Sequence, residues 1–160
     1  MGAPVGGELI CPLCGRQAIC IDSKEVYGRS HGQMWICPNR PCSVYVGCHL
    51  DSNVPKGTLA TPAMREARKT AHAAFDQLWR SAEEAYEIHE KGFARGKVVR
   101  RLRRTARNRA YQWLAAQLKI HVDDCHIGMF DIDTCARVFY LCQGVNSWDI
   151  RDWHKGGKNS

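Results

Sequence analysis

Two pairs of closely spaced cysteines constrain this chain more than any other feature of its sequence. Cys11 and Cys14 are separated by two residues, and Cys37 and Cys42 by four. A pair with this spacing turns back on itself, so both thiolates face one ion, and a structural zinc takes four such ligands. Proline and glycine residues flank the pairs and favour the necessary turns. We therefore predict one structural Zn²⁺ on these four cysteines, with no open position for a catalytic water. The alternative is four free, buried cysteines.

The total number of cysteines bears on the cellular compartment. The chain has nine of them, an odd number, and its first residues lack the charged and apolar regions of a signal peptide. A secreted disulfide scaffold has an even count as a rule. We therefore expect a cytoplasmic protein with reduced thiols. No apolar run reaches the about 18 residues of a membrane-spanning helix, and we expect no membrane partner.

The other five cysteines have weaker interpretations. Cys135 and Cys142 fall on the apolar face of an expected helix, where cysteine behaves as a small hydrophobic residue. Cys20 has no assigned role. Two Cys-His dipeptides, Cys48-His49 and Cys125-His126, would form a second metal site only if the fold brought them together, because no local spacing links them.

The N-terminal part of the chain alternates short β-type segments with turns. Residues 17–22, 34–37 and 43–48 are rich in β-branched and aromatic side chains. The segment 27–32 between the first two contains glycine and serine and predicts a hairpin turn. These strands would form the hairpins of a zinc ribbon over residues 8–55.

The pattern becomes helical after residue 55. Thr61 and Pro62 predict the start of a helix of about 20 residues, since threonine is a capping residue and proline suits the first helical position. Apolar residues then recur at spacings of three and four, as an amphipathic helix requires. A final helix is expected to begin at Asp131 and to end at Gly144.

The region between these helices is less regular. Over residues 83–118 the apolar side chains occupy two helical faces, roughly 120° apart by the helical period. One straight helix cannot bury both faces against one surface. We therefore expect a break near Thr105 and a new helix over residues 106–118.

Together these elements predict an α+β fold, with a small N-terminal zinc ribbon packed on a C-terminal part of three to four helices. The expected divisions are the ribbon at 8–55, a helical part at 56–144 and a mobile tail at 145–160. We expect the ribbon and the helical part to form one compact unit.

Several motifs in this chain resemble known families. The cysteine region is similar to the zinc ribbons at the C-termini of type I topoisomerases, which are modules associated with nucleic acid. More closely, the chain resembles a family of zinc-finger-containing proteins found largely in phages and prophages. That resemblance implies zinc on the four paired cysteines and supplies no activity. The motifs that carry it are CPLCG (11–15), VYGRS (26–30), ICPNRPC (36–42), YVGCH (45–49), PKGTLA (55–60), REARKTAHAAFDQLW (65–79), AYQWLA (110–115) and CHIGMFD (125–131).

A basic segment is the main candidate for binding a partner. Residues 91–110 hold nine of the 23 lysines and arginines and none of the 16 acidic residues. Arginine suits phosphate because its planar guanidinium donates two hydrogen bonds at once. We predict that this segment binds DNA or RNA, with Tyr111 as a nearby stacking surface. Acidic residues at 83–90 would neutralise part of it. The residues predicted to bind nucleic acid are Arg100, Arg101, Arg103, Arg104, Arg107 and Arg109.

Other functions remain open. A solvated helix face is the simplest alternative for the basic segment. A protein that inhibits or redirects a host enzyme, acting in the host cytoplasm if the chain is phage-encoded, is a second. A metal-dependent nuclease is a third, with His72 and Asp76 four residues apart on one helix face, or with His49 or His126. A surface salt bridge, or a role in capping or packing, explains these residues more simply, and the chain has no nucleotide-binding loop or Ser/His/Asp signature.

Overall fold

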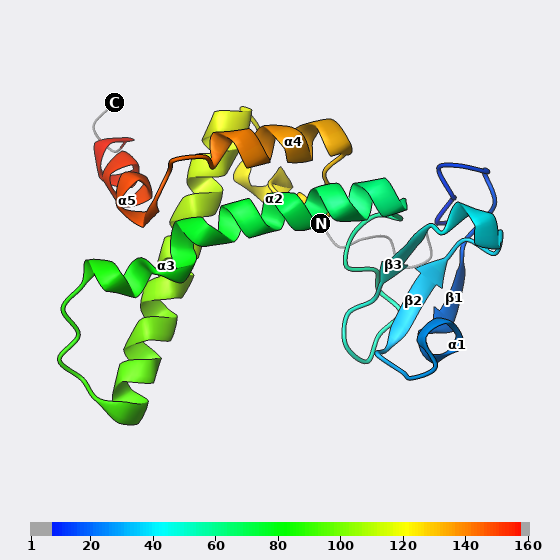
Figure 1. Cartoon of the computed structure of the whole chain (residues 1–160), viewed down its shortest axis with the longest axis horizontal. Helices are drawn as coiled ribbons and strands as arrows, with labels where there is room; N and C mark the ends of the chain where they lie inside the picture. The colour runs from blue at the N-terminus through cyan, green and yellow to red at the C-terminus, as the bar shows by residue number, and fades with distance from the viewer. Residues whose placement is uncertain (1–7, 158–160) are drawn as a thin grey trace. The chain divides into compact units, whose positions relative to one another are not determined.

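A computed structural model describes residues 8–157 of the chain (Figure 1). It confirms the α+β class: a three-stranded antiparallel sheet lies in the N-terminal part and several helices follow it. The chain divides into two compact units, one ending at Glu66 and the other beginning at Ala67. Among residues 8–157, no helix combines the length and the apolar character that crossing a membrane requires.

The first unit, which we call the sheet unit, is built on one meander. Its strands are β1 (Ile19–Asp22), β2 (Gln33–Ile36) and β3 (Tyr45–Gly47), in the order β1-β2-β3. A single helical turn, α1 (Lys24–Tyr27), connects β1 to β2, and its last residue is followed by Gly28 with φ of 77°. That left-handed conformation suits glycine. The predicted hairpin and the third strand are therefore confirmed.

The boundary of the sheet unit lies further along the chain than residue 55. Ala60 exchanges two backbone hydrogen bonds with Tyr45, at 3.1 and 3.2 Å, and so extends the sheet beyond β3. Arg65 donates to the carbonyl oxygens of Ser43 and Ala60, and its guanidinium lies 3.8 Å from the centroid of the Tyr45 ring. These contacts join the residues up to Glu66 to the sheet unit.

The first long helix begins where the sequence predicts. Helix α2 (Pro62–Arg80) starts with proline, and the Thr61 side chain accepts a hydrogen bond from the backbone N–H of Met64. Phe75 and Leu78 are fully buried, and the Phe75 ring centroid lies 4.5 Å from that of Tyr111. The apolar stripe therefore faces the core of the second unit, which we call the helical unit.

The predicted break near Thr105 is wrong. Helix α3 (Gly92–Leu118) is continuous, and Figure 1 shows it as one ribbon. Its first half turns Leu102 and Ala106 towards the short helix η2 (Ala82–Ala85) and towards a later helix, α5 (Ser147–Gly156). Its second half places Leu114 in the main core. Both apolar faces of α3 pack against other helices, because its two halves have different neighbours.

The end of the chain also differs from the expectation of a mobile tail. After the predicted helix α4 (Ile132–Leu141), which Asp131 caps, a further helix α5 (Ser147–Gly156) forms. Asn146 and Asp149 make a reciprocal capping box at its start. Ile150 is 2% exposed and belongs to the core of the helical unit. The end of α4 near Gly144 and the start at Asp131 follow the prediction.

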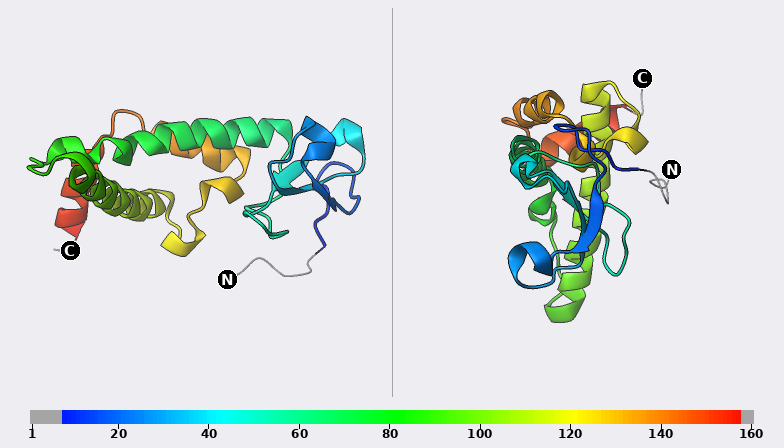
Figure 2. Two further views of the ribbon diagram at one scale, coloured as in Figure 1. Left: turned by 90° about the horizontal axis from the view of Figure 1, so that it is seen from below. Right: turned by 90° about the vertical axis from the view of Figure 1, so that its right-hand side faces the viewer.

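The core of the helical unit collects apolar side chains from α2, α3, α4 and α5. Ile127 of the short helix η4 (Ile127–Met129) and Cys125, which follows the short helix η3 (Val122–Asp124), also belong to it. Two perpendicular views show α4 alongside α2, with α3 crossing α2 (Figures 1 and 2). A buried arginine assists this packing, because Arg68 donates from Nε to the carbonyl oxygen of Phe130 at 2.9 Å.

Candidate metal centre and basic groove

The first cysteine pair lies in a tight backbone turn. The Cys11 N–H donates to the carbonyl of Arg16 at 2.8 Å, and the Gly15 N–H donates to the carbonyl of Cys11 at 3.0 Å. Gly15 has φ of 70°, where a side chain would be strained. The turn directs the side chains of Cys11 and Cys14 to the same side, as the two-residue spacing predicts.

The second pair is held by a short helix that follows β2. Cys37 continues β2, and its N–H donates to the carbonyl of Val44 at 2.9 Å. The helix η1 (Arg40–Cys42) then brings Cys42 back towards Cys37. Asn39 donates from Nδ2 to the Cys42 sulfur at 3.2 Å, a contact of the kind that stabilises a negatively charged thiolate.

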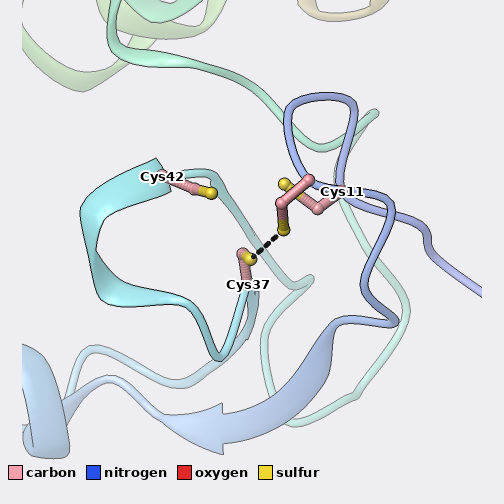
Figure 3. A group of neighbouring side chains, drawn as sticks. Cys11, Cys37 and Cys42 are labelled. Atoms are coloured by element: carbon pink, nitrogen blue, oxygen red, sulfur yellow. Dashed lines mark hydrogen bonds between the residues drawn. The ribbon is translucent and has the colours of Figure 1, made fainter.

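The two turns bring all four sulfur atoms together. They lie within 4.8 Å of one another, and the Sγ atoms of Cys14 and Cys37 are 3.5 Å apart. A tetrahedron with Zn–S bonds near 2.3 Å has sulfur atoms about 3.8 Å apart. Figure 3 shows Cys11, Cys37 and Cys42 with their sulfur atoms directed into one space. The cluster therefore fits one structural zinc ion.

The environment of the cluster acts on its thiols in opposite directions. A hydrogen bond from the Arg16 backbone lowers the pKa of Cys14 to about 7. Burial raises the pKa of Cys37 to about 12 and also raises the pKa of Cys42. Burial disfavours the charged form of a thiol when nothing compensates the charge. A divalent zinc ion supplies that compensation and binds the thiolate form.

The family of the chain agrees with this geometry. A family described as a zinc-finger-containing domain matches residues 8–98 and 96–145. Because the match covers most of the 160 residues, the chain belongs to that family, as its motifs predict. No curated protein and no solved structure gave a match.

The two Cys-His dipeptides do not lie in one compact unit. Cys48 and His49 belong to the sheet unit, whereas Cys125 and His126 belong to the helical unit. Within residues 8–157, the four paired cysteines are the one group of three or more metal-ligand side chains that gathers. The buried residues Cys125, Cys135 and Cys142 belong to the core of the helical unit.

The basic segment lies on α3 and lines a groove in the helical unit. This basic groove has a volume of about 570 Å³ and is lined by Trp79 and six cationic side chains. Its cationic residues are Lys97, Arg100, Arg101, Arg103, Arg104 and Arg107. Arg109, which was predicted with them, lines a different cavity between η2, α3 and α5.

One arginine of the groove is neutralised inside the protein. Arg103 forms a two-point ion pair with Glu83 of η2, and its Nε lies 2.9 Å from Oε2. This pairing raises the pKa of Arg103 and lowers that of Glu83. The acidic segment before α3 therefore removes part of the positive charge, as the sequence predicts.

Aromatic rings accompany the arginines of the groove. The Arg107 guanidinium lies 5.5 Å from the centroid of the Tyr111 ring and 5.6 Å from that of Trp79. The sequence predicts that Tyr111 lies near the arginines, since it is one helical turn from Arg107, but it does not predict the position of Trp79. Trp79 lies on α2 and is only partly buried. Its contact with Arg107 of α3 depends on how the two helices pack, and no local pattern in the sequence indicates it.

The residues considered for catalysis do not gather into one group of metal ligands within residues 8–157. Asp76 accepts hydrogen bonds from Arg80 at 2.6 Å and from the Trp79 indole N–H at 3.2 Å, so it forms the surface salt bridge. Burial lowers the pKa of His72. Among the described residues, neither His49 nor His126 joins them in a metal-ligating group.

Proposed function

We propose that this chain is a zinc-stabilised nucleic-acid-binding protein. Cys11, Cys14, Cys37 and Cys42 hold one Zn²⁺, which fixes the fold of the sheet unit. The arginines of the basic groove contact the phosphate backbone of DNA or RNA. The observation that carries the proposal is the groove itself, because six cations and an indole ring line one surface without a carboxylate in its lining.

The contribution of each arginine follows from its partners. Arg103 is committed to Glu83, so it positions the groove and binds phosphate least. In the described part of the chain, Arg100, Arg104 and Arg107 form no ion pair with a carboxylate. These three recur at spacings of three and four on α3 and therefore share a helix face. They are the principal phosphate-binding residues of the proposal, with Arg101 beside them and Arg109 outside the groove.

Aromatic side chains add a second kind of contact. A base stacks on an exposed aromatic ring irrespective of its sequence, and the contact is worth about 1–3 kcal/mol for each base. Trp79 lies within the lining of the groove. This combination of cations and an aromatic ring favours nucleic acid over an acidic protein surface as the occupant.

The test is a salt titration of binding by the full chain, with Arg100→Glu, Arg104→Glu and Arg107→Glu combined. Each phosphate contact on duplex DNA contributes a slope of roughly −0.9 in log K against log salt. We expect the triple variant to lose binding and to keep its zinc. A matched control reverses three exposed cations outside the groove, at Lys24, Lys56 and Arg137, and should bind nearly as well as the unchanged chain.

Equal binding by the two triple variants, or an affinity that ignores salt, would refute the proposal. Retention of a protein partner by the unchanged chain after nuclease treatment would then favour the protein-binding regulator. Metal-dependent cleavage of the bound strand would favour a nuclease. Origin in a phage or prophage and location in the host cytoplasm are part of the same proposal, and they rest on the motif resemblance.

A further inference from the structure

A second cavity lies within the helical unit, between η2, α3 and α5, and we call it the α3–α5 pocket. It has a volume of about 190 Å³. Three arginines line it: Arg101 and Arg109 from α3, and Arg151 from α5. Thr105 and Ser147 add hydroxyl groups, and no acidic side chain of residues 8–157 lines the cavity.

The arginines of the pocket have no direct ion-pair partner among the described residues: within residues 8–157, no ion pair joins Arg101, Arg109 or Arg151 to a carboxylate. Like charges that converge on a small cavity repel one another, and an anion placed between them relieves that repulsion. Guanidinium groups match the oxygen atoms of phosphate in a two-point geometry. The pocket is therefore suited to an anion with several oxygen atoms.

One of the arginines is held in position by aromatic rings. The Arg151 guanidinium lies 5.0 Å from the centroid of the Tyr86 ring and 5.4 Å from that of Trp148. Such contacts limit the conformations of a long side chain before a ligand arrives, which reduces the entropy cost of binding. By contrast, the backbone N–H groups of Trp148 and Asp149 at the start of α5 already donate to Asn146. The groups offered to an anion are thus side chains.

The remaining wall of the pocket is apolar. Ala82, Leu102, Ala106 and Ile150 form it, and Ile150 is 2% exposed. Inorganic phosphate alone would leave this wall in contact with water. A phosphate attached to a small organic group would use both the arginines and the apolar wall, as ligands of pockets with a few polar anchors do.

We propose that the α3–α5 pocket binds a phosphate monoester carried on a small organic group, of which a nucleoside monophosphate is the simplest example. Two sources share this chemistry: a free nucleotide, and the phosphorylated end of a nucleic-acid strand. The second source rests on the proposed function. It is favoured by Arg101, which lines both this pocket and the basic groove.

The experiment uses the zinc-loaded full chain and follows the methyl signals of Leu102 and Ile150 by NMR. Adenosine 5′-monophosphate is the probe, and adenosine is the control ligand. We expect the nucleotide to shift both signals and adenosine to shift neither at equal concentration. Arg109→Gln and Arg151→Gln, made separately, should each weaken binding by about tenfold, because each removes charged hydrogen bonds to the phosphate.

Arg137→Gln is the matched control, since it removes one exposed arginine from α4 and should leave the affinity unchanged. Three results would overturn the proposal: no shift with millimolar nucleotide, equal shifts with adenosine, or equal weakening by Arg137→Gln. Two separate variants guard against one of them failing to fold.

A second arm separates the two sources. It compares oligonucleotides with and without a 5′-phosphate for binding and for the same methyl shifts. A stronger shift with the phosphorylated strand would assign the strand end as the ligand, and no shift with either strand would assign the free nucleotide. Equal shifts with both strands would show that the pocket takes a phosphodiester and would overturn the proposal. If neither strand binds, the proposed function fails, while the result with the mononucleotide still decides whether the pocket is a site.

Discussion

The two units of this protein are stabilised by different physical means. The buried apolar cluster of the sheet unit has six described members, and three of them are the cysteines Cys11, Cys37 and Cys42. The helical unit has sixteen described members in its cluster, with large side chains such as Phe75 and Leu114 at its centre. Hydrophobic burial scales with apolar area removed from water. The sheet unit therefore depends on its metal, whereas the helical unit depends on packing.

The largest expected effect breaks the sheet unit alone. Cys37→Ser, or removal of zinc by a chelator, should unfold the residues around the metal centre, because a structural zinc contributes about 10–16 kcal/mol in small modules. The helical signal in circular dichroism should largely remain. Elemental analysis should give one zinc per chain before the change and little after it. The control is Cys20→Ser, which lies outside the cluster and should keep the zinc. If the helical signal is lost together with zinc, the helical unit also depends on the metal and the contrast between the units is wrong.

The next effect breaks the helical unit alone. Phe75 is fully buried and contacts Tyr111. Phe75→Ala should lower the free energy of unfolding of this unit by about 3–5 kcal/mol, as deletion of a buried ring does. Chemical unfolding followed by the helical signal measures it. Phe93 is 76% exposed, so Phe93→Ala should change little, and zinc content should be unchanged in both variants.

A similar substitution in α5 tests whether the C-terminal residues belong to the helical unit. Ile150→Ala should cost about 2–5 kcal/mol, since the side chain is 2% exposed within the core. A mobile tail would give no measurable change. Asp152→Ala, at an exposed position of the same helix, is the control, and a loss equal to that of Ile150→Ala would point to helix propensity rather than burial.

The features that the sequence predicts correctly are mostly local. Each cysteine pair closes within a few residues, and the caps at Thr61 and Asp131 act on the next turn, so short-range patterns reveal them. The continuity of α3 depends on which neighbours lie beside each half, and no local pattern contains that information. Helix α5 has one fully buried residue, Ile150, and so its apolar periodicity is weak. Its readable signal was the capping box that Asn146 forms with Asp149.

The groove shows the same division between local and distant information. The basic segment can be recognised in the sequence because its lysines and arginines lie close together in one stretch of the chain. The partners that shape it come from elsewhere: Glu83 from η2 and Trp79 from α2. Arg109 turns to a different cavity because it lies on another side of α3. The density of positive charge in the sequence therefore predicts that a basic surface lies on α3. The packing of the helices determines which arginines line the basic groove.

The smallest expected effect concerns acid, which lowers the stability of the two units for different reasons. In the sheet unit, protons compete with zinc for thiolates, so acid releases the metal. In the helical unit, hydrogen bonds from Thr134 hold the pKa of Asp131 below its ordinary value. A carboxyl with a lowered pKa stabilises the fold above its unfolded pKa of about 3.9 and loses that contribution as the pH falls through the folded value.

Asp131→Asn keeps a capping residue that does not titrate. The difference in unfolding midpoint between the unchanged chain and this variant should therefore be larger at pH 6 than at pH 3. Zinc release is common to both chains and cancels in that difference. A difference that stays constant between the two pH values would show that the ionised Asp131 cap adds nothing to the helical unit.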